Sequence, residues 1–116
     1  MPPSQHAMDI TFETKQLRDM CESERLLRNR FGDAEGSLIV GRLADMRACN
    51  SLGDFQSLML TTFAPSNSGK RMLIKFGAST IEVEPSLRHL PLDVDGNVDW
   101  KNVQRIKLVS VGNLNA

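Results

Sequence analysis

Residues 90–111 have the sequence Leu90-Pro-Leu-Asp-Val-Asp-Gly-Asn-Val-Asp-Trp-Lys-Asn-Val-Gln-Arg-Ile-Lys-Leu-Val-Ser-Val111, which is the most informative part of the chain. The first part is an acidic turn. Asp99 follows it where the N-cap of one helical turn is expected, since a short carboxylate side chain accepts hydrogen bonds from free backbone N–H groups. Apolar residues then recur through 103–111, which predicts the last strand of a sheet.

The segments before this stretch predict a β-hairpin. Residues 70–76 and 79–84 are expected to pair across Gly77, because glycine at the first turn position suits a type II′ turn. In this register one face is apolar, with the pairs Ile74–Ile81 and Met72–Val83. The other face is mostly polar, with the pairs Leu73–Glu82, Lys75–Thr80 and Arg71–Glu84.

The N-terminal half has helical spacing after a short alternating strand at 9–13. A first helix is predicted from a Thr14 N-cap to Gly32, and a second from Asp33 to residues 50–53, with Ile39, Leu43 and Met46 on its buried face. Residues 58–63 are β-prone. The predicted fold class is α+β, with two N-terminal helices packed on one face of a mostly antiparallel sheet of four to five strands.

The composition of this 116-residue chain is that of one globular domain, at 41% hydrophobic and 24% charged residues. Residues 8–116 are expected to form it, and residues 1–7 to be a disordered leader or residues added for expression. Cys21 and Cys49 have no Cys or His at ligand spacing, so free thiols are favoured over zinc ligands, while a disulfide remains open. No apolar run approaches the ~20 residues needed to span a bilayer and no signal peptide is evident, which predicts a cytoplasmic protein without membrane contact.

Two loops resemble ligand-binding motifs without meeting their requirements. Residues 64–71 lack the first glycine and the final Ser or Thr of a phosphate-binding loop, and they lead into a strand instead of a helix. Asp93, Asp95, Asn97 and Asp99 alternate like calcium ligands, but Gln104 stands where a bidentate glutamate is required. No cofactor and no metal ion is therefore expected.

Basic residues of the second half are the candidates for nucleic-acid binding, namely Lys70, Arg71, Lys75, Arg105 and Lys107. If they line one face of the sheet, they supply phosphate contacts. Glu82 and Glu84 are expected directly across the hairpin, so a self-compensated solvent face is an equal alternative, and the formal net charge of zero weakens the nucleic-acid interpretation. His89, beside Arg88, is a weak candidate for a general acid or base, with a solvated loop pair as the favoured alternative.

The opening Met8-Asp-Ile-Thr-Phe-Glu-Thr-Lys-Gln-Leu-Arg18 and the run Asp95-Gly96-x-x-Asp99-Trp100-x-x-Val103-x-x-Ile106 resemble the HigB branch of the RelE/ParE toxin superfamily, the plasmid maintenance killer proteins. The resemblance covers residues 8–115. It implies the toxin component of a bacterial or phage type II toxin–antitoxin module, neutralised by a cognate helix–turn–helix antitoxin. An active member of this branch is a metal-independent, ribosome-dependent endoribonuclease that cuts mRNA with Arg or Lys on the phosphate and His, Asp or Tyr for proton transfer.

The positions that carry this chemistry in the family are substituted in this chain. Thr80 stands where the family has an arginine, Thr61 where it has a histidine, and residues 112–115 replace its terminal His or Tyr motif; the chain contains no tyrosine. The catalytic residues are therefore unknown, and ordinary mRNA cleavage is not expected. The alternative function is a non-enzymatic interaction module on the same fold, either an antitoxin-binding co-repressor or a ParE-like protein directed at gyrase.

Overall fold

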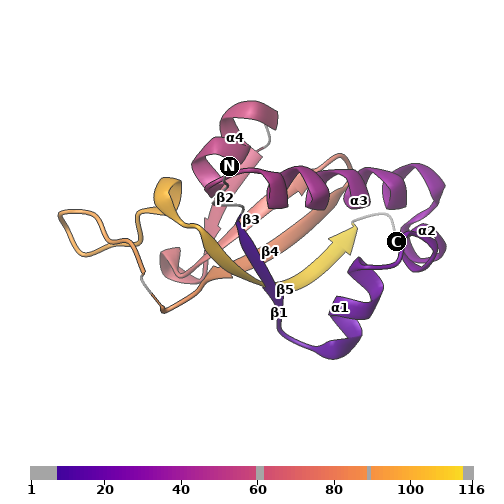
Figure 1. The fold of residues 1–116 in the computed structure, drawn as a ribbon, viewed down its shortest axis with the longest axis horizontal. Coiled ribbons are helices and arrows are strands. Elements are labelled where there is room, and N and C mark those ends of the chain that lie inside the picture. The colour runs from indigo at the N-terminus through magenta and orange to yellow at the C-terminus, as the bar shows by residue number, and fades with distance from the viewer. Residues whose placement is uncertain (1–7, 60–61, 89, 114–116) are drawn as a thin grey trace, which may run out of the picture.

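The structure is a computed structural model that describes residues 8–59, 62–88 and 90–113. In chain order its elements are β1 (Asp9–Phe12), α1 (Lys15–Cys21), α2 (Glu24–Phe31), α3 (Asp33–Ala48), α4 (Leu52–Met59), β2 (Thr62–Ser66), the 3-10 turn η1 (Asn67–Gly69), β3 (Arg71–Phe76), β4 (Ser79–Pro85), the 3-10 turn η2 (Trp100–Asn102) and β5 (Arg105–Asn113). The strands form one sheet in the order β1-β5-β4-β3-β2 (Figure 1). Strand β1 is parallel to β5 and the other neighbours are antiparallel. The α+β class is confirmed, but the described residues form four α-helices instead of two.

The helix predicted for residues 14–32 is wrong as a single element, because it is divided into α1 and α2. Thr14 caps α1 as predicted, since the Leu17 N–H donates to its hydroxyl at 3.0 Å. Ser23 caps α2 in the same way, accepting from the Leu26 N–H at 3.2 Å. A serine side chain that satisfies a free N–H favours a new helix start over continuation of the old one.

Helix α3 confirms the second predicted helix, and it begins directly after α2. Gly32 joins the two with φ of 96°, a value that glycine adopts without strain. The predicted buried positions Ile39, Leu43 and Met46 are all 1% exposed or less. Close approach to α2 depends on Gly36, where an added Cβ would lie 2.5 Å from the backbone nitrogen of Arg28.

The strand predicted for residues 58–63 is wrong at its start, because α4 continues to Met59 and β2 begins at Thr62. The Ser51 hydroxyl accepts a hydrogen bond from the Asp54 N–H at 3.2 Å near the start of α4. Leu52 and Phe55 are completely buried, so tertiary packing of this face stabilises α4, and the helix extends over the first two residues of the β-prone segment.

The predicted hairpin is confirmed in its register, with Ile74 opposite Ile81 and Met72 opposite Val83. Gly77 has φ of 57° in the turn between β3 and β4, as its predicted role requires. The carboxylate of Glu35 on α3 holds this turn from the helix layer, accepting from the Ala78 N–H at 3.3 Å and the Ser79 hydroxyl at 2.9 Å.

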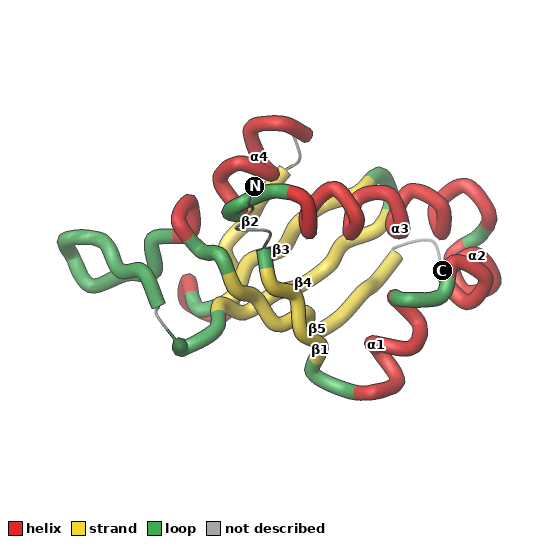
Figure 2. The backbone as a smooth tube through the Cα atoms, viewed as in Figure 1, coloured by secondary structure: helices red, strands yellow, loops and turns green. Residues whose placement is uncertain are grey.

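Residues 92–98, which we call the arm, project from the sheet at the end opposite α2 (Figure 2). Leu92 and Val98 form an isolated antiparallel bridge at its base. The Asp93 carboxylate accepts from the N–H groups of Asp95 and Asn97 at 2.8 and 3.0 Å, which confirms the acidic turn. The 3-10 turn η2 follows the arm, but its predicted cap is wrong, because the Asp99 side chain accepts from the side chain of Asn102 and caps no backbone N–H.

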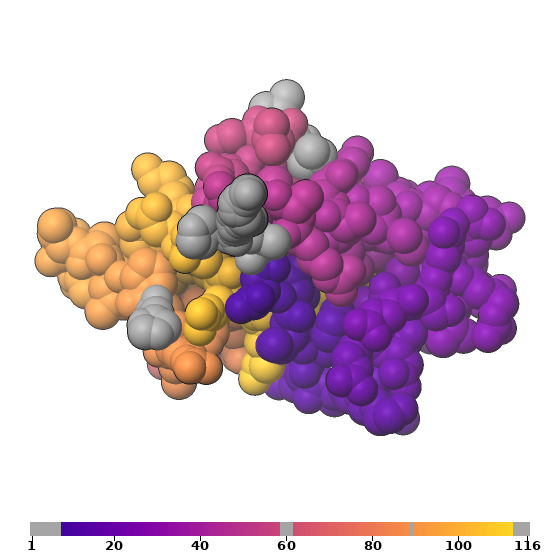
Figure 3. Space-filling view, in the orientation of Figure 1, coloured from indigo at the N-terminus to yellow at the C-terminus, as the bar shows by residue number. Residues whose placement is uncertain are grey.

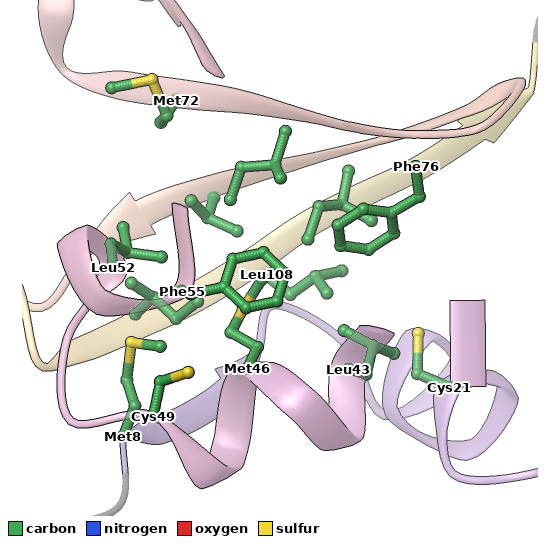
Figure 4. Packing of buried hydrophobic residues seen from close by; sticks show 14 of the residues in the cluster. Met8, Cys21, Leu43, Met46, Cys49, Leu52, Phe55, Met72, Phe76 and Leu108 are labelled. Atoms are coloured by element: carbon green, nitrogen blue, oxygen red, sulfur yellow. The ribbon is translucent and has the colours of Figure 1, made fainter. Parts of the chain in front are cut away.

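The core lies between the helices and one face of the sheet. Phe55 and Phe76 meet edge to face with ring centroids 6.1 Å apart, and Met46 and Leu108 lie in the same layer (Figure 4). Burial of one such side chain stabilises the fold by about 1.5–3 kcal/mol. Cys21 and Cys49 are buried free thiols, as favoured from the sequence.

Candidate functional surface

The face of the sheet turned away from the helices carries most of the predicted binding residues, and we call it the open face. Side chains alternate across a strand, so the residues next to the buried Met72, Ile74, Ile81 and Val83 point away from the core. The open face comprises Asp9, Thr11, Arg71, Leu73, Lys75, Thr80, Glu82, Glu84, Arg105 and Lys107.

Glu84 lies at the centre of the charges on the open face. The Arg71 Nε donates to Glu84 Oε2 at 2.8 Å from β3, and the Lys107 Nζ lies 3.2 Å from Glu84 Oε1 on β5. The hydrogen bond from Arg71 is the main cause that lowers the pKa of Glu84 from its ordinary value of 4.5, and Lys107 lowers it further. The same hydrogen bond raises the pKa of Arg71. Both cations therefore already have a charged partner.

Further ion pairs extend this arrangement to both sides. Glu82 Oε1 lies 3.7 Å from Arg71 NH1, and its other oxygen accepts from the Ser66 hydroxyl on β2 at 3.0 Å. Lys107 also approaches Glu13 at 3.8 Å, and Arg105 Nε approaches the carboxylate of Asp9 at 3.6 Å. Paired charges thus join β3, β4 and β5 through Arg71, Glu84 and Lys107, and a separate pair, Arg105 with Asp9, joins β5 to β1.

The six residues singled out from the sequence fall into three groups. Arg71, Arg105 and Lys107 lie on the open face with carboxylate partners. Lys75 lies on the same face and Lys70 just before β3, and within the described part of the chain neither takes part in an ion pair. His89 lies outside the described residues.

A cleft of about 930 Å³ opens at the end of the sheet where the arm begins. Glu84 and Lys107 of the open face line it, and so does Lys70. The apolar residues that line it are Pro65, Pro85, Leu87, Leu90, Leu92, Val98 and Trp100. A concave apolar surface with a few polar groups is the usual form of a binding site.

Sequence reasoning missed this cleft because distant segments form it. The Trp100 indole N–H donates to the carbonyl of Gly69 at 3.2 Å, which joins η2 to the loop before β3. Asn67 and Ser68 in that loop have φ of 50° and 56°, conformations that are uncommon for residues other than glycine. The Ser-Asn-Ser-Gly composition was a signal for a tight turn, but no local pattern indicated its contact with the tryptophan.

The two histidines of the chain, His6 and His89, both lie outside the described residues. Across residues 8–59, 62–88 and 90–113, no three His, Cys, Asp or Glu side chains are grouped so as to hold a metal ion. Nor do these ranges contain a helix long and apolar enough to cross a membrane.

Comparisons of this chain with protein-family models, with curated proteins and with solved structures gave no match.

Proposed function

We propose that this chain is a HigB/RelE-type component of a bacterial or phage toxin–antitoxin module that acts by binding proteins and not by cutting mRNA. The observation that carries the second half of this proposal is the pairing of Arg71 and Lys107 with Glu84. A ribonuclease of this type needs free cations to stabilise the extra charge on the phosphoryl group. On this face a phosphate would compete with carboxylates that already hold those cations.

The order of the elements supports the first half of the proposal. A short strand, helices and then a meander of strands follow one another along the chain. The resemblance to the HigB branch implies a short strand and two helices at the start, and the described residues have four α-helices there. Among its described residues the open face carries no histidine and no tyrosine for the two proton transfers of RNA cleavage. Binding of a cognate helix–turn–helix antitoxin requires no such group.

The experiment is tightly induced expression of the full chain in a bacterial host, with growth and transcript ends measured together. We expect intact transcripts, whether or not growth stops, and co-purification of a helix–turn–helix partner when the chain is expressed with its native flanking genes. Transcripts cut at ribosome-bound codons would overturn the binding mechanism.

A variant pair separates the two mechanisms further. The double substitution Arg71→Ala and Lys107→Ala removes the cations that a phosphate would need, and Arg25→Ala on α2 is the matched control. If growth stops for wild type, we expect arrest to persist in both variants. Arrest that is lost only in the double variant, at equal soluble protein, would point to RNA contact on the open face.

A further inference from the structure

Large apolar side chains are exposed on and beside the arm. Val94 at its tip is 100% exposed, Leu92 is 55% exposed, and Leu87 in the preceding segment is 86% exposed. Apolar side chains gathered in this way on one projecting segment are typical of a contact surface. Single exposed apolar residues need no such explanation, but Leu87 and Leu92 both line the cleft, and Val94 lies two residues beyond Leu92 on the arm.

The charge beside this apolar tip is unpaired. The Asp93 carboxylate is bound to the backbone of its own turn. Asp95, next to Val94, is exposed and forms no ion pair within the part of the chain that the structure describes. The arm therefore ends in an apolar side chain followed directly by a free carboxylate.

The cleft is complementary to the end of the arm in both polarity and charge. Its walls are apolar, with Leu87, Leu90 and Trp100, and the exposed Lys70 stands at its side. Lys107, which also lines the cleft, is bound to Glu84, whereas Lys70 forms no ion pair within the described residues and is available to a carboxylate from outside. An apolar side chain with a neighbouring carboxylate thus matches an apolar wall with a neighbouring ammonium.

We propose that the chain forms a two-fold symmetric dimer in which the arm of each copy lies in the cleft of the other. Val94 packs against the apolar wall around Trp100, and Asp95 pairs with Lys70 of the second copy. Because arm and cleft adjoin in each copy, one two-fold rotation engages both at once, as an isologous interface requires. The formal net charge of zero imposes no general repulsion between copies. This dimer is independent of any antitoxin.

The test measures self-association by sedimentation velocity of the full chain from about 1 µM to about 1 mM, a range that spans weak and moderate affinities. We expect a concentration-dependent dimer for wild type. Lys70→Glu and Asp95→Lys each place like charges together at both symmetric contacts, so each alone is expected to raise the dimer dissociation constant at least about tenfold. An equimolar mixture of the two variants restores both contacts, one natural and one reversed, and is expected to associate within about threefold of wild type.

Controls at the other end of the molecule make the result specific. Arg25→Glu and Glu22→Lys reverse exposed charges near α2, far from the arm (Figure 3), and are expected to dimerise like wild type. Val94→Ser leaves the charges intact and is expected to weaken the dimer. Circular dichroism of each variant is the control for folding. The fluorescence of Trp100, the one tryptophan in the chain, is expected to shift with concentration in wild type but not in Val94→Ser.

A wild-type chain that stays monomeric over the whole range would overturn the proposal. So would a dimer that the single charge reversals leave unchanged, or one that mixing the two variants fails to restore, because only reciprocal exchange predicts recovery in the mixture. A small apolar anion or an acidic peptide that fills the cleft of a monomeric chain would assign the cleft to another ligand.

Discussion

The carboxylate of Glu35 accepts a hydrogen bond from the hydroxyl of Ser79 across 44 residues of sequence. Glu35 lies on α3 and Ser79, which is completely buried, begins β4. The other carboxylate oxygen of Glu35 accepts from the Ala78 N–H. One side chain of the helix layer therefore holds the turn on which the register of the β3–β4 hairpin depends.

Replacing Glu35 by alanine is expected to lower the free energy of unfolding by about 1–3 kcal/mol, because two hydrogen bonds to a charged acceptor are lost at a partly buried site. Urea unfolding at neutral pH measures the change. Glu35→Gln keeps an acceptor oxygen and is expected to lose less. Equal stability of wild type and Glu35→Ala would show that the turn needs no support from α3.

Two glycines of α3 offer a matched pair of substitutions with opposite expected signs. An alanine Cβ at Gly36 would lie 2.5 Å from backbone atoms of Arg28, so Gly36→Ala is expected to cost about 1–3 kcal/mol through overpacking. At Gly41 nothing lies within 4 Å, and Gly41→Ala is expected to stabilise the chain by about 0.5–1 kcal/mol, since alanine is the better helix former. Thermal unfolding of both variants measures this, and a Gly36→Ala variant as stable as wild type would contradict the close α2–α3 contact.

The ion pairs of Glu84 predict a dependence of stability on pH. The pKa of Glu84 is lower in the folded chain than its ordinary value of 4.5, so the unfolded chain takes up a proton more readily as the pH falls. The stabilisation from Glu84 is therefore fully present above about pH 4.5 and is lost as the pH falls through the lower folded pKa. Glu84→Gln removes this contribution at every pH.

We expect wild type and Glu84→Gln to differ most in free energy of unfolding above about pH 4.5 and to converge as the pH falls through the lower folded pKa of Glu84. Urea unfolding at a series of pH values tests this. Glu22→Gln, at the exposed residue that follows α1, serves as a control for the general effect of removing one carboxylate. A difference that stays constant with pH would mean that the contacts of Glu84 do not depend on its charge.

The buried thiols are expected to resist alkylation. Burial raises the pKa of Cys21 from 9.0 to about 11 and also raises the pKa of Cys49. Because only the thiolate reacts, this rise alone makes the folded Cys21 roughly a hundredfold less reactive with iodoacetamide at mildly alkaline pH. Mass spectrometry of native and urea-unfolded protein compares the rates, and equal rates would place Cys21 at the surface.

The parts of the fold that follow from local patterns were predictable from the sequence. The hairpin register follows from period-two alternation around Gly77, and the start of α1 follows from Thr14. The division between α1 and α2 was within reach, because Ser23 is itself a cap residue. Helix α4 was not predictable, because it is stabilised by core contacts of Leu52 and Phe55 with distant residues and not by local helix propensity.

For the candidate surface, the sequence predicts only which side chains point away from the core. Alternation along the strands indicates that Arg71 and Lys107 point away from the core. It does not indicate that they share Glu84, because the pairing of β4 with β5 shifts at an irregularity between Glu82 and Val83. The cleft depends on Trp100 reaching Gly69 over 31 residues, which no local pattern encodes.

The position of β5 between β1 and β4 has a consequence for synthesis on the ribosome. β5 emerges after every other described strand, yet β1, the first to emerge, has no strand neighbour but β5 in the described sheet. The hydrogen bond from the Thr11 hydroxyl to the Ile106 carbonyl joins residues that are 95 positions apart in the sequence. A nascent chain can form its helices and the β3–β4 hairpin early, because these contacts are local. Strand β1 stays unpaired until β5 has been synthesised. The complete sheet therefore forms late and in one cooperative step.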